Sequence, residues 1–221
     1  NLYLMKFKSF LKNPPNDKYI YFPLQMTGEA MLDVWAPLYQ DQYFLIRQLS
    51  KYIPIKYKFL VKVHFSSPTS LSNRQINLLK KKNFVEFVHP YASNKEFLKR
   101  SSLVVCITGS SIIESSILNK PVLTMVKSPY NVFSNVHTFK SFDYLPTQIN
   151  SLIKRNNINN LNLNKEFEKY LNQYMRGINN YWSDKPIPKK DIENFIEGFN
   201  VLINYLKKDK NKANWYTNFL K

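Results

Sequence analysis

The pattern of apolar and polar residues changes repeatedly along residues 18–126. Short apolar runs predict five strands, at residues 18–24, 57–65, 83–90, 102–108 and 121–126. Apolar residues at helical spacing predict helices between them, at residues 39–53, 73–82, 94–101 and 111–120. Strands that alternate with helices indicate an α/β fold with a Rossmann-like, doubly wound parallel sheet. The continuous apolar strands fit a sheet that is covered on both faces.

The two ends of the chain have a different character. Residues 1–12 predict a short basic amphipathic helix or the tail of a preceding segment, and the prolines of 13–17 indicate a linker. After about residue 140 the chain is polar, Asn-rich and helical in pattern, with a clear amphipathic helix at 191–208. We therefore expect three parts: an amino-terminal segment and linker, a Rossmann-like domain and a helical carboxy-terminal extension. Their expected bounds are 1–17, 18–148 and 149–221.

The chain is strongly basic, with 32 Lys and Arg against 15 Asp and Glu and a formal net charge of +17. One interpretation is a compositional bias toward Lys and Asn that yields a well-solvated surface. The other is attraction to an anion: a nucleotide, a phospholipid surface, an acidic polysaccharide or a nucleic acid. Net charge alone does not choose between these interpretations.

The sequence shows no targeting or membrane-spanning segment, and we therefore expect a cytoplasmic protein. The single cysteine, Cys106, lies in an apolar run, where it is typical of a small core residue and excludes an internal disulfide. The sequence has neither a signal peptide nor an apolar stretch of the length that a membrane span needs. The basic surface adds the hypothesis of peripheral contact with an anionic inner membrane. Because the chain begins with Asn, we expect it to be part of a longer protein.

Candidate binding residues follow the predicted strands. In doubly wound sheets ligands bind outside the carboxyl ends of the strands, at the switch in strand order. The candidates at these ends are Gln25, Glu29, Lys62, His64, His89, Gly109, Ser110, Ser111 and Glu114.

The stretch "TGSSIIE" (108–114) is the strongest of these signals. Gly109 permits a tight turn, and Ser110 and Ser111 offer hydroxyl and N–H groups where a helix begins, which favours an anion. Glu114 could accept hydrogen bonds from ribose hydroxyls. The alternative is an ordinary capped helix with Ser110 as the N-cap. The spacing matches neither a P-loop nor the G-x-G-x-x-G fingerprint.

The other strand ends give weaker signals. Lys62 shares a strand face with His64, a pair that suits a diphosphate or a sugar-nucleotide phosphate, although a solvated Lys and a satisfied His would look the same. A metal site at His64 and His89 is disfavoured because no carboxylate spacing supports it, so we expect no metal. Gln25, Glu29, Asp41 and Gln42 form a polar cluster. Such a cluster is more typical of fixed loop geometry than of chemistry.

Four segments together resemble the capsule polysaccharide biosynthesis family, which includes the bacterial Kdo transferases. The segments are "YIYFPLQMTGEAML", "DQYFLIRQLSKYIP", "KYKFLVKVHFSS" and "FLKRSSLVVCITGSSIIESSILNKPVL". They occur in the family's order and cover about residues 18–126. The chain departs from the family's motifs at Val63, where an acid is usual, at Phe65, where proline is usual, and at Asn119, where glycine is frequent.

The resemblance implies a GT-B glycosyltransferase, and within it the carboxy-terminal domain that holds the donor nucleotide. The donor would be a CMP-activated acidic sugar such as CMP-Kdo, and the acceptor a capsule polysaccharide or lipopolysaccharide glycolipid. It places His64 near the donor phosphate, Ser110 and Ser111 on that phosphate, and Glu114 on the nucleotide. Lys62 and Glu29 match further family positions, His64 and Glu29 are the catalytic candidates, and no cofactor is required.

Two other functions remain open on sequence. A nucleic-acid-binding protein would fit the charge and the basic, aromatic tail, but the chain carries no recognised motif and its basic residues are dispersed, so nucleic acid is not the expected partner. A GT-B-like epimerase acting on sugar nucleotides would need carboxylates from a further domain.

Overall fold

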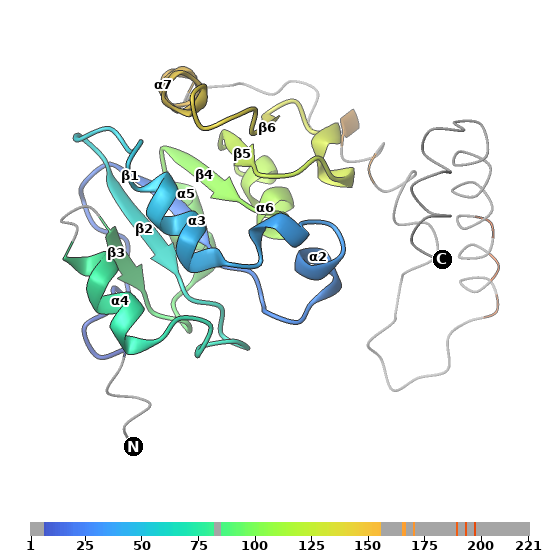
Figure 1. The fold of residues 1–221 in the computed structure, drawn as a ribbon. Helices are drawn as coiled ribbons and strands as arrows, with labels where there is room; N and C mark the ends of the chain where they lie inside the picture. The colour runs from blue at the N-terminus through green and yellow to red at the C-terminus, as the bar shows by residue number, and fades with distance from the viewer. Residues whose placement is uncertain are drawn as a thin grey trace. The chain divides into compact units, whose positions relative to one another are not determined.

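A computed structural model describes residues 7–81 and 85–155 and single positions at 165, 166, 170, 189, 193 and 197. Within these described residues, six strands form one sheet in the order β3-β2-β1-β4-β5-β6, and every neighbouring pair is parallel (Figure 1). The strands are β1 (Tyr19–Pro23), β2 (Lys58–Lys62), β3 (Val85–Val88), β4 (Leu103–Cys106), β5 (Val122–Thr124) and β6 (Val136–Thr138).

Helices and 3₁₀ turns connect the strands, and α7 follows the last of them. The helices are α2 (Ala30–Asp33), α3 (Gln42–Leu49), α4 (Asn73–Lys80), α5 (Asn94–Arg100), α6 (Ser111–Ile117) and α7 (Leu145–Lys154), with 3₁₀ turns η1 (Pro37–Tyr39) and η2 (Pro129–Val132). Side chains fix two of the helix starts. Asp41 accepts a hydrogen bond from the Phe44 N–H at 2.8 Å, and Ser72 and Gln75 form a capping box.

Both faces of the sheet are covered. Ile20 and Phe22 of β1 belong to a core cluster that includes residues of α3, α4 and α7. Tyr19 and Tyr21 alternate with these residues along β1 and point to the opposite face. The centroid of the Phe97 ring, in α5, lies 6.4 Å from that of Tyr19 and 5.7 Å from that of Tyr21. This alternation confirms the predicted Rossmann-like, doubly wound α/β fold.

The five predicted strands are all present, each shorter than its apolar run. The sixth strand was not predicted, because β6 is only three residues long and its sequence "VHT" has one apolar residue. A four-residue helix, α2, also lies between the predicted strand at 18–24 and the predicted helix at 39–53, where no helix was predicted. Neither element is long enough to display a period in the sequence.

The described part of the amino-terminal segment, residues 7–12, forms a turn and a β-bridge, so the interpretation as a helix is wrong there. The Phe10 N–H donates to the Phe7 carbonyl at 3.0 Å, and both rings are buried in the core. Leu11 then bridges Val88, with backbone hydrogen bonds to Phe87 and His89 on the free edge of β3. This edge supplies backbone partners that an isolated turn of helix would lack.

The chain divides into two compact units, Asn1–Leu163 and Asn164–Lys221. The predicted helix at 191–208 lies outside the described residues, apart from positions 193 and 197, which are helical. In that unit Lys189 and Glu193 form an i,i+4 ion pair at 3.9 Å. Across the described ranges, no helix combines the length and apolarity that membrane crossing demands.

Candidate functional site

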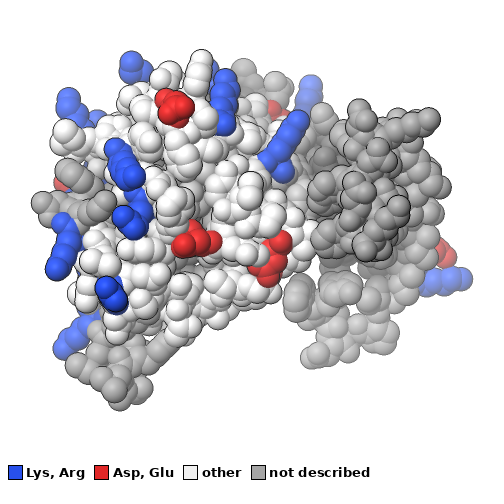
Figure 2. Space-filling model, viewed as in Figure 1, with Lys and Arg blue, Asp and Glu red and all other residues white. Residues whose placement is uncertain are grey.

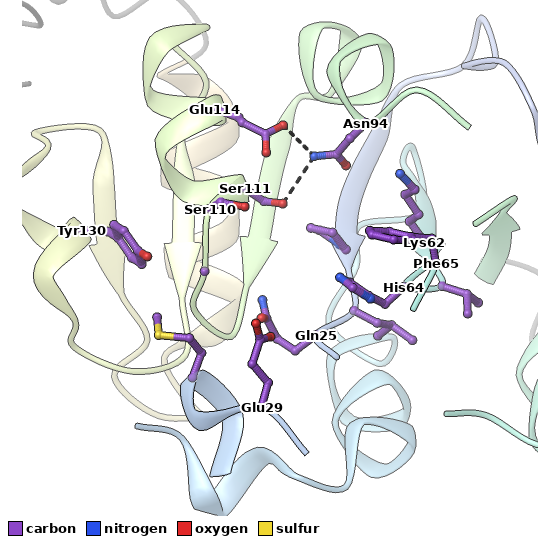
Figure 3. A pocket seen from close by; sticks show the side chains of 15 residues that line it. Gln25, Glu29, Lys62, His64, Phe65, Asn94, Ser110, Ser111, Glu114 and Tyr130 are labelled. Carbon is purple, nitrogen blue, oxygen red and sulfur yellow. Dashed lines mark hydrogen bonds between the residues drawn. The ribbon is translucent and has the colours of Figure 1, made fainter. Parts of the chain in front are cut away.

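The strand order creates a crevice between β1 and β4. Chain segments leaving these neighbouring strands diverge, from β1 toward α2 and α3 and from β4 toward α6. This is the switch point at which doubly wound sheets bind ligands. A cleft of about 400 Å³ opens there, lined by the ends of β1 and β2, the segments that follow them, and the first residues of α5 and α6 (Figure 3).

The cleft brings together eight residues that the sequence singled out: Gln25, Glu29, Lys62, His64, Gly109, Ser110, Ser111 and Glu114. His89 lies elsewhere, because β3 is the edge strand and its end is covered by the amino-terminal segment. The His89 ring packs edge-on against Phe7 at 5.9 Å, and its Nδ1 accepts from the Tyr91 N–H.

Sequence reasoning missed Asn94, Met31 and Tyr130 as lining residues. Asn94 begins α5 after β3, and Tyr130 lies in η2 after β5, so both also follow strand ends. Applying the strand-end rule to the first two residues of each following helix or 3₁₀ turn would have included both.

The turn after β4 depends on glycine. Gly109 has φ +99°, and a Cβ built on it would lie 3.0 Å from both Oε1 and Nε2 of Gln25. The Gln25 side chain donates to the Thr108 carbonyl. Gln42 holds the Gln25 backbone in turn, accepting from its N–H at 2.8 Å and donating to its carbonyl at 3.0 Å. Gln25 and Gln42 thus fix loop geometry.

Ser110 keeps its hydroxyl available. It stands at the N-cap of α6, but within the described part of the chain its side chain makes no capping hydrogen bond, and the residue is exposed. Ser110 is therefore the N-cap residue that the alternative predicted, but without the side-chain hydrogen bond of a capped helix. The Ser110 hydroxyl can donate into the cleft.

A hydrogen-bonded group lies beside Ser110. The Asn94 Nδ2 donates to Glu114 Oε2 at 2.8 Å and to Ser111 Oγ at 3.4 Å (Figure 3). The Tyr21 hydroxyl donates to Asn94 Oδ1 at 2.7 Å. Residues from β1, α5 and α6 thereby meet at one side of the cleft.

Lys62 and His64 supply further donors. The Lys62 Nζ donates to the Ala92 carbonyl at 2.9 Å and keeps two further protons for a ligand. Burial lowers the pKa of Lys62, and the Glu114 carboxylate opposes that shift. The His64 Nδ1 accepts from the Ser66 N–H at 3.2 Å, so a neutral ring carries its proton on Nε2 and donates there.

The imidazole pKa values predict acid sensitivity. Burial lowers the pKa of His64, with Glu29 opposing and Lys62 adding to the shift. Burial likewise lowers the pKa of His89 and His137. Since each folded pKa lies below the unfolded value, the unfolded state binds more protons as the pH falls. We expect these histidines to contribute full stability above about pH 6.5 and to lose it as the pH falls through their folded pKa values.

Urea unfolding at pH 7.5 and pH 5.5 tests this expectation: the midpoint falls at the lower pH. The same measurement on a variant with all three histidines changed to glutamine serves as the control, and its midpoint changes less. An equal loss in both proteins would contradict the assignment to these histidines.

Within the described ranges, no three His, Cys, Asp or Glu side chains gather closely enough to hold a metal ion. Hydrogen-bond donors stand at successive strand ends around the cleft. Two carboxylates, Glu29 and Glu114, also line it. In Figure 3 Glu114 and Glu29 lie on opposite sides of Ser110 and Ser111. This arrangement can bind an anion between two carboxylates, each of which can accept a hydrogen bond from a ligand hydroxyl.

Comparison with models of known protein families gives no match, and comparison with curated proteins gives none either. Among solved structures, the chain is similar to the glycotransferase of kitacinnamycin, with a TM-score of 0.44 and 11% identity over 74% of this chain and 42% of that one. It is also similar to the wall teichoic acid polymerase TagF soaked with CDPG, with a TM-score of 0.44 and 15% identity over 94% of this chain and 48% of that one. A second TagF structure gives 0.42 and 14% over the same shares.

The chain thus spans less than half the length of these solved proteins. All three TM-scores are below 0.5, so these similarities do not assign a function to the chain.

Proposed function

We propose that the cleft binds the phosphate of a nucleotide-activated sugar and that the chain is the donor-binding domain of a glycosyltransferase. The observation that carries this proposal is the convergence of four donors, from Lys62, His64, Ser110 and Ser111, at the switch point between β1 and β4. Such donors suit a phosphate, and each of them would bind more strongly as negative charge develops on a departing one.

The residues have separable roles in this scheme. In glycosyl transfer, the acceptor hydroxyl oxygen bonds to the anomeric carbon, and the bond from that carbon to the donor phosphate oxygen breaks. The phosphate departs with the bonding electron pair, and the donors of the cleft stabilise its charge. Glu114 accepts from the nucleotide's ribose. Glu29 is the candidate to receive the proton of the acceptor hydroxyl, because its carboxylate reaches the cleft. His64, whose Nδ1 accepts from Ser66 and whose Nε2 carries the ring proton, acts instead as a donor to the departing phosphate.

The resemblance described above narrows the proposed donor to a CMP-activated acidic sugar such as CMP-Kdo. The proposed pathway is capsule or lipopolysaccharide assembly, with a polysaccharide or glycolipid as acceptor. The net charge of +17 supports anionic partners in general.

Isothermal titration calorimetry with CMP tests the proposed site. We expect Ser110→Ala and His64→Ala each to weaken binding roughly tenfold, since each removes one hydrogen bond to a charged group. His89→Gln and Ser151→Ala, which lie outside the cleft, serve as controls and should bind CMP as the wild type does. Unchanged affinity in both cleft variants would rule out this site.

The alternative function, nucleic-acid binding, predicts a different distribution of basic residues. Figure 2 shows Lys and Arg spread over the visible face of the described residues instead of gathered into one track. Nucleic-acid-binding surfaces usually concentrate such residues. Salt-dependent binding of random oligonucleotides, tighter than binding of any nucleotide, would favour nucleic acid over the proposed donor.

A further inference from the structure

We propose that Tyr21 and Asn94 are positioning residues that fix Ser111 as a hydrogen-bond donor and Glu114 as an acceptor, so that the cleft selects a ligand with a phosphate beside a hydroxyl. This inference rests on the proposed nucleotide site. It assigns the selectivity of that site for such a ligand to Tyr21 and Asn94, which the sequence did not single out.

The relay begins at a buried tyrosine. Tyr21 lies in the central strand β1 with its ring stacked on Phe97. Burial raises the pKa of the Tyr21 hydroxyl well above its ordinary value, so the group keeps its proton. That proton is donated to Asn94 Oδ1 at 2.7 Å. A protonated phenol can donate or accept, so this hydrogen bond alone does not fix which way the Asn94 amide is turned.

The carboxylate of Glu114 determines which way the Asn94 amide is turned. With Oδ1 toward Tyr21, the two protons of Nδ2 point toward Glu114 and Ser111. The reverse orientation would place the amide oxygen against the Glu114 carboxylate, with two acceptors facing each other and no proton between them. The Glu114 end thus fixes the orientation of the amide, and the Tyr21 hydroxyl donates to the Oδ1 that this orientation presents.

Ser111 and Glu114 are left with complementary roles. The Ser111 Oγ accepts from Asn94, so its own hydroxyl proton remains free to be donated into the cleft. One carboxylate oxygen of Glu114, Oε2, is occupied by Asn94, and the other can accept from a ligand hydroxyl. A ligand that satisfies both groups carries an anionic oxygen at Ser111 and a hydroxyl one helical turn further along α6.

Tyr21→Phe tests the relay, with Tyr19→Phe as a matched control. Both tyrosines lie on the same face of β1 and contact the Phe97 ring. The Tyr19 hydroxyl donates to the Phe97 carbonyl at 2.7 Å, away from the cleft residues. The two variants thus each lose one buried hydroxyl, but only Tyr21→Phe releases Asn94.

The measurements are the affinities for CMP and for cytidine, because their ratio reports the phosphate contact. We expect Tyr21→Phe to lower the CMP affinity roughly fivefold, the effect of losing about one hydrogen bond, and to reduce the ratio of CMP to cytidine affinity. Tyr19→Phe should leave that ratio at the wild-type value. Asn94→Asp places a carboxylate beside Glu114 and should reduce CMP affinity further than Tyr21→Phe does.

Three results would overturn the inference. The first is a Tyr21→Phe protein that binds both probes as the wild type does. The second is a proportional loss for both probes that leaves the ratio unchanged, which would show that Tyr21 does not position the Ser111 contact to the phosphate. The third is a wild-type protein that binds neither probe; in that case the proposed nucleotide site fails as well, which separates this outcome from the first two.

Discussion

Replacing Phe10 by alanine is expected to lower the free energy of unfolding by about 3–5 kcal/mol, the range for a buried phenylalanine. The Phe10 side chain is 4% exposed and its ring is stacked on that of Phe87 at 5.2 Å. A second ring, from Phe7, meets it edge-on at 5.2 Å, and the Lys80 Nζ lies 4.8 Å from its centroid. The substitution removes all of these contacts and leaves a cavity. Urea unfolding followed by circular dichroism measures the change.

Phe44→Ala is the control for this experiment. Phe44 is 52% exposed on α3, so its replacement should cost less than about 1 kcal/mol. Equal losses for the two variants would contradict the conclusion that the amino-terminal segment contributes to the core.

Replacing Gly109 by alanine is expected to destabilise the protein by about 2 kcal/mol and to weaken CMP binding at least tenfold. Two effects combine at this position: a side chain is strained at φ +99°, and its Cβ would displace the Gln25 amide. Because Gln25 holds the Thr108 carbonyl, its displacement shifts the turn that presents Ser110 and Ser111. Chemical unfolding and calorimetry on the same variant measure the two effects.

Gly28→Ala separates strain from displacement. Gly28 has φ +78°, but no described atom lies within 4 Å of the Cβ it would gain. We expect a loss of about 1 kcal/mol, from backbone strain alone, and little change in CMP affinity. If Gly28→Ala weakened CMP binding as much as Gly109→Ala, the contact between Gly109 and Gln25 would not explain the effect.

The central strands could be predicted because burial on both faces produces continuous apolar runs. β1 and β4 are buried at every position, and the runs that contain them are plain in the sequence. β6 has only one neighbouring strand, and a short edge strand can carry His137 and Thr138 without a recognisable pattern. The pairing of Leu11 with β3 is equally invisible, since it uses backbone groups alone.

The rule that ligands bind at the carboxyl ends of strands identified most of the cleft and failed at His89. Both outcomes follow from the order of the strands in the sheet. Carboxyl ends of parallel strands meet at one edge of the sheet, but only those near the switch point surround the same crevice. β1, β2 and β4 are neighbours there, whereas β3 lies at the far edge. The order of the strands, which local sequence does not encode, determines that Lys62 lines the cleft and that His89 does not. The partners of Asn94 also become apparent only after β1, α5 and α6 are placed together.

The position of β1 has a consequence for synthesis on the ribosome. Its two neighbours, β2 and β4, are made at different times: Tyr21 pairs with Leu60 on one side and with Val104 on the other. A nascent chain that has released only β1–β3 therefore exposes an unpaired, apolar strand edge until Leu103–Cys106 emerge. Such an edge is a template for pairing with other chains. The strand that completes the ligand crevice is thus also the one that ends this exposure.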